Sequence, residues 1–196
     1  MSNELTVRIS CSIQEMCDIL EKKGFSRVDK FNLEDIYYIA KEIDITKQSI
    51  NEILKRYVLI RKITQFVPKT FIDSYNILKL TLKNKNIADN GEIISQDKVD
   101  CKIKNIEDGK QFIKSLGYKE LMTIKEKDIV YQKDNFKLAI KNIEDIEPLI
   151  EIETSNEFDT IDKLKKKINE LKIPIDENDY FVKKAEIELR KILQGE

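Results

Sequence analysis

The chain has 196 residues, of which 41% are hydrophobic, so it is long enough to bury the core of one folded domain. Its 35 basic and 36 acidic residues leave a net charge of −1, which offers no long-range attraction to nucleic acid or to an anionic membrane. Because histidine is absent, the sequence excludes a Ser-His-Asp or Cys-His centre and disfavours a zinc site.

Targeting and redox signals are equally sparse. The sequence has neither an apolar run of about eighteen residues nor a signal-peptide pattern, so we expect a cytoplasmic protein with no membrane segment. Its three cysteines, Cys11, Cys17 and Cys101, should be free thiols, with Cys17 on a buried helix face and Cys101 on the apolar face of a strand. Five glycines form no phosphate-cradling loop, so any phosphate would be held by lysine and arginine side chains.

The chain begins with an amphipathic strand. Leu5, Val7 and Ile9 alternate with polar residues, of which Glu4 and Arg8 carry charge. The same reasoning from periodicity and from turn residues predicts the elements of the remaining chain. They are a helix over 12–23, strands within 25–40, a short helix within 46–56, strands over 57–63, 71–83 and 92–104, a helix over 105–116, strands over 118–131, 136–141 and 149–154, and two C-terminal helices within 158–194.

An internal echo divides the predicted domain into two halves. A strand and a helix end at Gly24 and lead to the motif that begins at Asp35, and a second strand and helix end at Gly117 and lead to the motif that begins at Asp128. The interval from glycine to aspartate is the same in both. We therefore expect one domain over residues 1–196, with strand–helix–strand halves at about 1–95 and 96–155 and helices at about 158–194.

Several predicted strands place charged residues on one face. Two interpretations are open: the faces look outward to water, where charge limits aggregation at sheet edges, or the sheet curls closed and the faces line its interior. A closed wall that mixes several cations with a few acids suits a polyanion with a divalent metal, since lysine and arginine bind phosphate oxygens and carboxylates bind the metal.

The order of these segments resembles the CYTH superfamily, also called triphosphate tunnel metalloenzymes. That family includes class IV adenylyl cyclases, thiamine triphosphatases and inorganic triphosphatases. The resemblance covers roughly residues 4–153, and its motifs are individually short. The matching segments are Glu4-Leu5-Thr6-Val7-Arg8, Asp35-Ile36-Tyr37-Tyr38, Val58-Leu59-Ile60-Arg61, Leu80-Thr81-Leu82-Lys83, Leu116-Gly117-Tyr118, Lys125-Glu126-Lys127 and Glu151-Ile152-Glu153.

The resemblance implies an α+β fold in which a closed, eight-stranded antiparallel β-barrel forms a tunnel and helices pack outside it. It also implies that a cluster of acids coordinates Mg²⁺ or Mn²⁺ and that a set of cations holds the triphosphate. The acids would be Glu4, Asp100, Glu151 and Glu153. The cations would be Arg8, Arg61, Lys83, Lys125 and Lys127.

Four departures from the family pattern weaken the implied chemistry. Thr6 stands where the opening motif has its middle acid, and Leu59 stands where an arginine is usual. The family's Arg-x-Glu-x-Glu strand falls on residues 96–100, where it keeps only Asp100 of two acids, and a later aspartate falls near Lys141. The general base is not assignable from the residues.

Three functions remain open at this point. The chain is a metal-dependent hydrolase of a triphosphate compound, or a cyclase that makes cyclic AMP from ATP. Alternatively, it binds a polyphosphate or nucleotide without turnover. In a third alternative, the helices within 158–194 bind a partner protein. The expected ligand is a small triphosphate or nucleotide, with no nucleic acid or membrane partner, and the protein would be a monomer or a homodimer.

Overall fold

The computed structural model describes residues 4–66, 74–87 and 93–195. The described residues form eight strands and five helices, which confirms the α+β class. The strands are β1 (Glu4–Arg8), β2 (Ser26–Ala40), β3 (Arg56–Phe66), β4 (Ser74–Ile87), β5 (Ile93–Lys102), β6 (Tyr118–Lys133), β7 (Phe136–Ile143) and β8 (Leu149–Glu153). The helices are α1 (Ile13–Lys22), α2 (Ile50–Ile53), α3 (Ile106–Ser115), α4 (Ile161–Glu170) and α5 (Lys184–Gln194).

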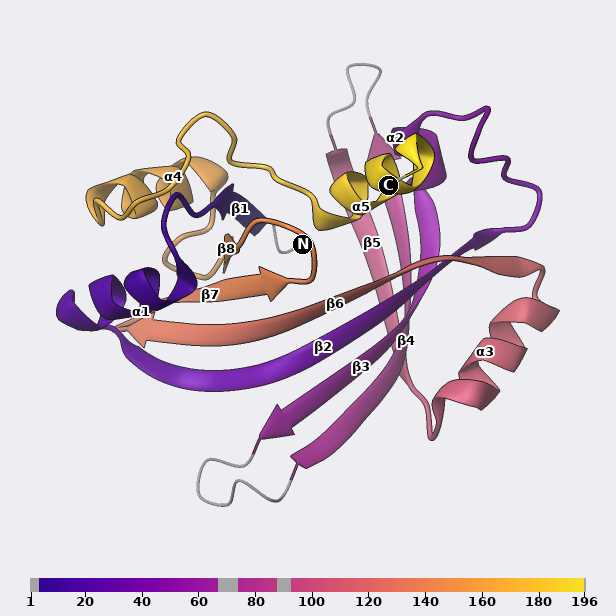
Figure 1. Ribbon diagram of the computed structural model, residues 1–196, viewed down its shortest axis with the longest axis horizontal. Helices are drawn as coiled ribbons and strands as arrows, with labels where there is room; N and C mark the ends of the chain where they lie inside the picture. Colours follow the sequence, from indigo (N-terminus) through magenta and orange to yellow (C-terminus); the bar gives the residue numbers. More distant parts are fainter. Residues whose placement is uncertain (1–3, 67–73, 88–92, 196) are drawn as a thin grey trace. The chain divides into compact units, whose positions relative to one another are not determined.

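The eight strands form one antiparallel sheet in the order β1-β8-β7-β6-β2-β3-β4-β5 (Figure 1). The predicted number and direction of the strands are therefore confirmed. Strands β1 and β5 stand at the two ends of this order, so hydrogen bonds between described residues do not close the sheet. Closure into a barrel stays a prediction.

The chain divides into two compact units, each of which combines separate stretches of the sequence. The first unit comprises Leu33–Lys125 with Lys184–Glu196, and the second comprises Ser2–Asn32 with Glu126–Lys183. Strands β2 and β6 each contribute one part to either unit, because the boundaries of the units fall within them.

In the second unit, helices α1 and α4 cover the apolar face of the strands. Leu5 and Val7 of β1 pack with Met16 and Leu20 of α1 and with Leu164 of α4 in one buried cluster. The outer edge of β1 is also covered, since the segment 174–182 makes backbone hydrogen bonds to β1 and to the residues that follow it. The free edge of this strand is thereby blocked, which prevents pairing with another chain.

In the first unit, helix α3 covers the apolar face. Ile113 of α3 packs against Ile36 and Tyr38 of β2 and Ile60 of β3. Because side chains alternate along a strand, the intervening residues of β2 and β3 point to the opposite face of the sheet. That opposite face carries the charged side chains described below.

Both predicted glycine stops are confirmed. Gly24 follows α1 with φ of 84° and Gly117 follows α3 with φ of 86°, a backbone region that glycine enters at no steric cost. At the other end of α1, Ser12 and Glu15 form a capping box. The local signals that the sequence carries at these helix ends are the ones that the fold uses.

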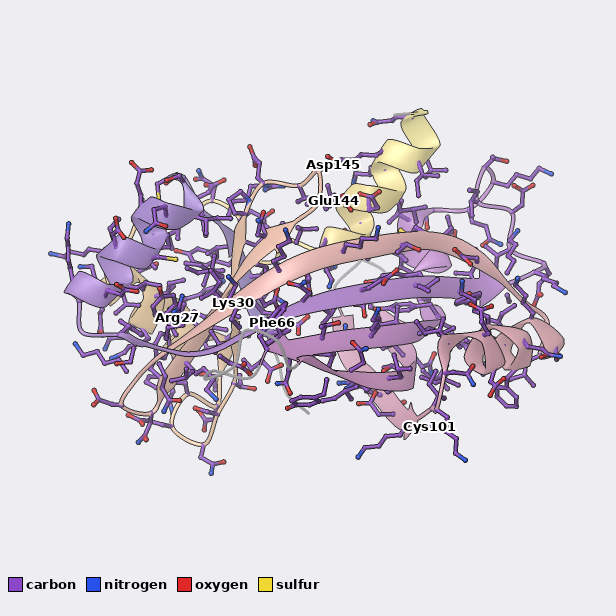
Figure 2. All side chains as sticks on the ribbon, turned by 60° about the horizontal axis from the view of Figure 1, so that its bottom comes forward. Arg27, Lys30, Phe66, Cys101, Glu144 and Asp145 are labelled. Carbon is purple, nitrogen blue, oxygen red and sulfur yellow. The ribbon has the colours of Figure 1, made fainter. Side chains whose placement is uncertain are left out.

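The predicted short helix within 46–56 is confirmed, and it comprises the single turn of α2. Cys101 lies opposite Leu80 on the apolar face of the edge strand β5, as expected, and it is exposed there (Figure 2); Cys17 is buried as expected. Pro68 and the predicted turn at 89–91 lie outside the described residues.

The C-terminal helices use their apolar stripes for packing. Leu164 and Ile168 of α4 are buried in the second unit, and Ala185 and Leu189 of α5 are buried in the first unit. This burial argues against a partner-binding role for these stripes. Among the described residues, none of the helices combines the length and the apolar content that crossing a bilayer requires.

Candidate functional site

Three carboxylates meet on the polar face of the second unit. In the antiparallel pairing of β1 with β8, Glu4 lies opposite Glu153 and Thr6 lies opposite Glu151. One ligand atom from each of Glu4, Glu151 and Glu153 lies within 4.8 Å of the others. We call this set the carboxylate trio. Glu4 and Glu153 are exposed and Glu151 is half-buried, so the trio is open to solvent on one side.

The trio has the chemistry of a site for a hard divalent cation. Its ligand atoms are all carboxylate oxygens, which Mg²⁺ and Mn²⁺ prefer. Oxygen ligands at about 2.1 Å from one Mg²⁺ lie at most about 4.2 Å apart, so the trio needs only a small closing movement to share one ion. Water would complete the coordination from the exposed side.

A buried lysine adjoins the trio. Nζ of Lys141 on β7 lies 3.0 Å from Oδ2 of Asp128, 3.3 Å from Oε1 of Glu126 and 3.4 Å from Oε1 of Glu151. The side chains of Glu126 and Asp128 on β6 are 0% and 2% exposed. We call these four residues the Lys141 cluster. Glu151 belongs to both the cluster and the trio.

The acids of the cluster decide the protonation state of Lys141. Burial alone would lower the pKa of Lys141, but the charges of Glu151, Glu126 and Asp128 outweigh it and hold the pKa well above its ordinary value. Lys141 is therefore an ammonium ion in any ordinary buffer, and it carries a permanent positive charge inside an acidic face.

Sequence reasoning noted Lys141 but missed its acidic partners. On β6, Met122, Ile124, Glu126, Asp128 and Val130 are all buried and fall on one parity of the strand. Two acids thus continue an apolar series, which is the signal of buried, paired charge that the sequence offered.

Alternation of side chains along β6 places Lys127 on the face opposite the trio. Lys127 is exposed, and it alternates with Glu126 and Asp128, so it points to the face of β6 opposite the Lys141 cluster. Lys125, which belongs to the first unit, shares the parity of Lys127 and is also exposed. The structure thus gives neither lysine a place on the face that carries the trio.

Arg8 does lie on the polar face of β1, where it contacts exposed acids. Its Nε lies 3.2 Å from Glu147 Oε2, and its Nη1 lies 3.7 Å from Asp179 Oδ2. The Arg8 side chain is about one-third exposed, so these pairs contribute little to stability and exchange readily with solvent. A phosphate oxygen could replace either acid.

The first unit has a buried acid between two cations. Asp35 on β2 is 0% exposed and accepts hydrogen bonds of 2.6 Å from both Nε and Nη2 of Arg61 on β3. Nζ of Lys184, at the start of α5, lies 3.3 Å from the same carboxylate. Burial raises the pKa of Asp35, but Lys184 and Arg61 together outweigh it and lower that pKa below the usual range. Sequence reasoning placed Asp35 in a motif without assigning it this role.

A second acid of the first unit organises lysines. Asp100 on β5 accepts a hydrogen bond of 2.7 Å from Thr81 on β4, and its other oxygen lies 3.1 Å from Nζ of Lys79 and 3.5 Å from Nζ of Lys98. Burial opposes ionisation of Asp100, yet the hydrogen bonds from Thr81 and Lys79 lower its pKa. Asp100 belongs to the first unit and the trio to the second, so the structure groups three of the four predicted metal ligands.

Lys83 stands on the same face of β4 as Lys79 and Thr81. Its neighbours across the strands are Tyr57 on β3 and Lys98 on β5. Leu59, between Tyr57 and Arg61 on β3, also points to this face and is 0% exposed. The apolar side chain of Leu59 is therefore tolerated on this charged face because it is shielded from solvent.

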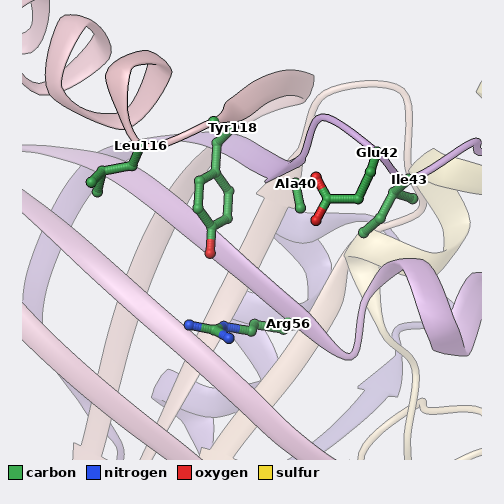
Figure 3. A pocket seen from close by; sticks show the side chains of 7 residues that line it. Ala40, Glu42, Ile43, Arg56, Leu116 and Tyr118 are labelled. Carbon is green, nitrogen blue, oxygen red and sulfur yellow. The ribbon is translucent and has the colours of Figure 1, made fainter.

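A hollow of about 390 Å³ lies in the first unit. Its lining includes Glu42 from the loop after β2, Arg56 from β3 and Tyr118 from β6 (Figure 3). The hollow contains none of the predicted site residues.

Comparison with known proteins identifies solved structures of similar fold. No family model matches the chain, and no curated protein matches its sequence significantly. Among solved structures, the PH1819 protein from Pyrococcus horikoshii OT3 is similar with a TM-score of 0.69 and 19% identity, over 97% of this chain and 99% of that one. A Hippeastrum protein described as a candidate adenylyl cyclase with a dominant triphosphatase activity has a TM-score of 0.62 and 13% identity, over 97% and 96% of the two chains.

A protein from Vibrio parahaemolyticus, described as a candidate adenylate cyclase, has a TM-score of 0.61 and 12% identity, over 97% of both chains. These likenesses extend along nearly the whole chain, and the identities are low. They establish that the chain shares the fold of these proteins, and the chemistry must be argued from its own residues.

Proposed function

We propose that this chain binds a triphosphate-bearing small molecule together with Mg²⁺ or Mn²⁺ and hydrolyses it. The substrate class comprises inorganic triphosphate, nucleoside triphosphates and thiamine triphosphate. The single observation that carries the proposal is the convergence of Glu4, Glu151 and Glu153, which come from the two ends of the CYTH-like motif order and lie within ligand distance of one another.

The cations of the first unit supply the complementary chemistry. Arg61, Lys79, Lys83 and Lys98 share one face of β3, β4 and β5, with Asp35 and Asp100 as internal acids. A triphosphate carries several negative charges, and lysine and arginine donate charge-assisted hydrogen bonds to its oxygens. Asp35 and Asp100 would hold these cations in place, so that less freedom is lost when the ligand binds.

An ion held by Glu4, Glu151 and Glu153 would polarise a phosphoryl oxygen and lower the pKa of a bound water. The side chains of the first unit would stabilise the charge that develops on the phosphoryl oxygens during in-line attack. The group that removes the proton from water is left open in this proposal.

The fold comparison supports the reaction class. The Hippeastrum protein of similar fold has a dominant triphosphatase activity, and the Vibrio protein is described as a candidate cyclase. Both reactions begin with a bound triphosphate. The CYTH-like motifs and the similarity of fold therefore both favour a protein that binds a triphosphate. Cyclisation of ATP to cyclic AMP is the alternative outcome for the same bound substrate.

Turnover by purified protein tests the proposal. With Mg²⁺ or Mn²⁺, wild-type protein should release phosphate from tripolyphosphate or from a nucleoside triphosphate, or form cyclic AMP from ATP. Glu153→Gln keeps the size of the side chain but weakens the metal ligand, so it should abolish turnover. Glu157→Gln, an exposed change in the same unit, should leave turnover intact. Absence of product from every substrate with either metal would refute hydrolysis.

Binding without turnover is the second candidate. It is favoured by two features of the first unit: Leu59 replaces a cation by a buried apolar side chain, and Arg61 is tied to Asp35. This candidate predicts that tripolyphosphate raises the melting temperature, because it binds the folded state preferentially, while no product forms. A melting temperature that does not change with any phosphate compound would contradict it.

The closed barrel belongs to the same proposal. In it, the charged faces of the strands would line one tunnel, as the resemblance implies. A crystal structure with tripolyphosphate and Mn²⁺ bound tests this directly, because it shows which of the charged strand faces contact the ligand.

A further inference from the structure

The Lys141 cluster has the arrangement of a cation site whose cation is part of the chain. Three carboxylate oxygens, from Glu126, Asp128 and Glu151, surround Nζ at 3.0–3.4 Å. Lys141 donates hydrogen bonds to Asp128 and Glu126 and forms an ion pair with Glu151, and all three distances exceed by about 1 Å the oxygen distances around Mg²⁺. Glu151 connects this arrangement directly to the carboxylate trio.

We propose that the Lys141 ammonium occupies the place that a second divalent ion would take beside the trio, so that this face binds one exchangeable divalent ion. The inference rests on the metal-binding role of the trio in the proposed function. It makes Lys141 a positioning residue, since it acts by holding Glu151 between a fixed positive charge and the ion.

Charge supports this role. The trio and the cluster together contain five carboxylates: Glu4, Glu126, Asp128, Glu151 and Glu153. Glu126 and Asp128 are almost completely buried, so water screens their charge poorly, and a nearby cation is needed to keep them ionised. With the ammonium present, a single divalent ion offsets half of the remaining negative charge. Without the ammonium, the five carboxylates carry one more uncompensated charge, so a second ion is bound more readily.

Geometry supports it as well. Carboxylates that bridge two metal ions place those ions about 3.5–4 Å apart. Glu151 takes a comparable position between two cation sites. One of its oxygens contacts the Lys141 ammonium, and the residue also supplies a ligand atom to the trio. Lysine at this position fixes the occupant covalently, so the site cannot lose it or exchange it.

The test counts bound Mn²⁺ by electron paramagnetic resonance of the free ion, with no substrate present. Wild-type protein should bind one equivalent. Lys141→Ala should bind two, because it leaves three acids around a vacated position. Lys137→Ala, an exposed lysine on the same strand, should bind one equivalent as wild type does. The triple variant Lys141→Ala/Glu126→Gln/Asp128→Asn should again bind one equivalent of Mn²⁺, because it lacks the charged ligands of the second position.

Folding is controlled separately, because Lys141→Ala leaves buried acids without their partner. The double variant Lys141→Ala/Asp128→Asn removes one charge of each sign, and it keeps two carboxylates and an amide oxygen as ligands. Circular dichroism identifies which variants are folded. A second equivalent of Mn²⁺ in either folded variant supports the inference, and one equivalent in both overturns it.

The outcomes also separate this inference from the proposed function. If wild-type protein binds one Mn²⁺ and the folded Lys141 variants bind no more, the inference fails and the trio remains a metal site. If wild-type protein binds no Mn²⁺, the metal role of the trio fails, and the inference that rests on it fails as well.

Discussion

At the scale of single residues, Asp35 shows how this fold keeps a charge inside. Its carboxylate is fully buried, and it is held by two hydrogen bonds from Arg61 and by Lys184 from α5. A buried ion pair of this kind contributes little compared with an apolar alternative, but the loss of one partner leaves the other uncompensated. Asp35 therefore fixes both the orientation of Arg61 and the start of α5.

Asp35→Asn should destabilise the protein by about 3–5 kcal/mol, because Arg61 and Lys184 would keep their charges without a counter-ion. Urea unfolding followed by circular dichroism measures the change. Asp97→Asn, an exposed position on β5 in the same unit, should change stability by less than about 0.5 kcal/mol. Equal effects of the two substitutions would contradict the role given to Asp35.

The lowered pKa of Asp35 predicts how this difference varies with pH. In the unfolded chain the pKa of an aspartate is about 3.9, above the folded value, so acid favours the unfolded state. The stability that Asp35 contributes is complete at neutral pH and is lost as the pH falls through the unfolded and then the folded pKa. The gap between wild type and Asp35→Asn should therefore narrow below about pH 4, and a constant gap between pH 7 and 3 would exclude this linkage.

At the scale of elements, alternation along the strands predicted which residues share a face, but it did not say which face is buried. The trio was predictable, because Glu4, Glu151 and Glu153 fall on the polar parity of two amphipathic strands. The Lys141 cluster was only partly predictable: Glu126 and Asp128 continue the buried series of β6, which indicates paired charge but does not identify the partner. The partner, Lys141, lies on a different strand, and only tertiary pairing reveals it.

Helix ends were predictable because their signals are local. Gly117 ends α3 with φ of 86°, and a Cβ added there would meet no atom within 4 Å, so only the backbone conformation opposes a side chain. Gly117→Ala should therefore destabilise the protein by about 1–2 kcal/mol, measured by urea unfolding. Gly195→Ala is the matched control: its φ is also positive and its surroundings are open, but it follows the last helix, where fraying absorbs the strain.

At the scale of the whole molecule, the two kinds of charge are assigned to different units. The carboxylate trio and the Lys141 cluster belong to the second unit, whereas Arg61, Lys79, Lys83 and Lys98 belong to the first. The near-zero net charge of the sequence conceals this separation, because it sums over both units. Sequence reasoning named the trio, Arg61 and Lys83 but could not assign them to units, since the units are not continuous in sequence.

This division predicts separable effects of ligand and metal on thermal stability. Saturating tripolyphosphate should raise the melting temperature of wild-type protein by about 5–10 °C, and Mg²⁺ should raise it further. Glu153→Gln should keep the first increase and lose the second, because it changes the metal ligands alone. Lys83→Ala should reduce the first increase, while Lys104→Ala, an exposed change in the same unit, should not. If Glu153→Gln removed both increases, the two roles would not be separable.

The pairing of β1 with β8 also sets an order of events during synthesis. Glu4 leaves the ribosome first, and its neighbour Glu153 follows nearly 150 residues later, which takes on the order of 10 s at usual elongation rates. Until then β1 lacks its partner strand β8, so its backbone groups on that side remain unpaired in the nascent chain. The trio is therefore complete only after Glu153 has been synthesised, and a metal ion that needs all three acids cannot template folding before then.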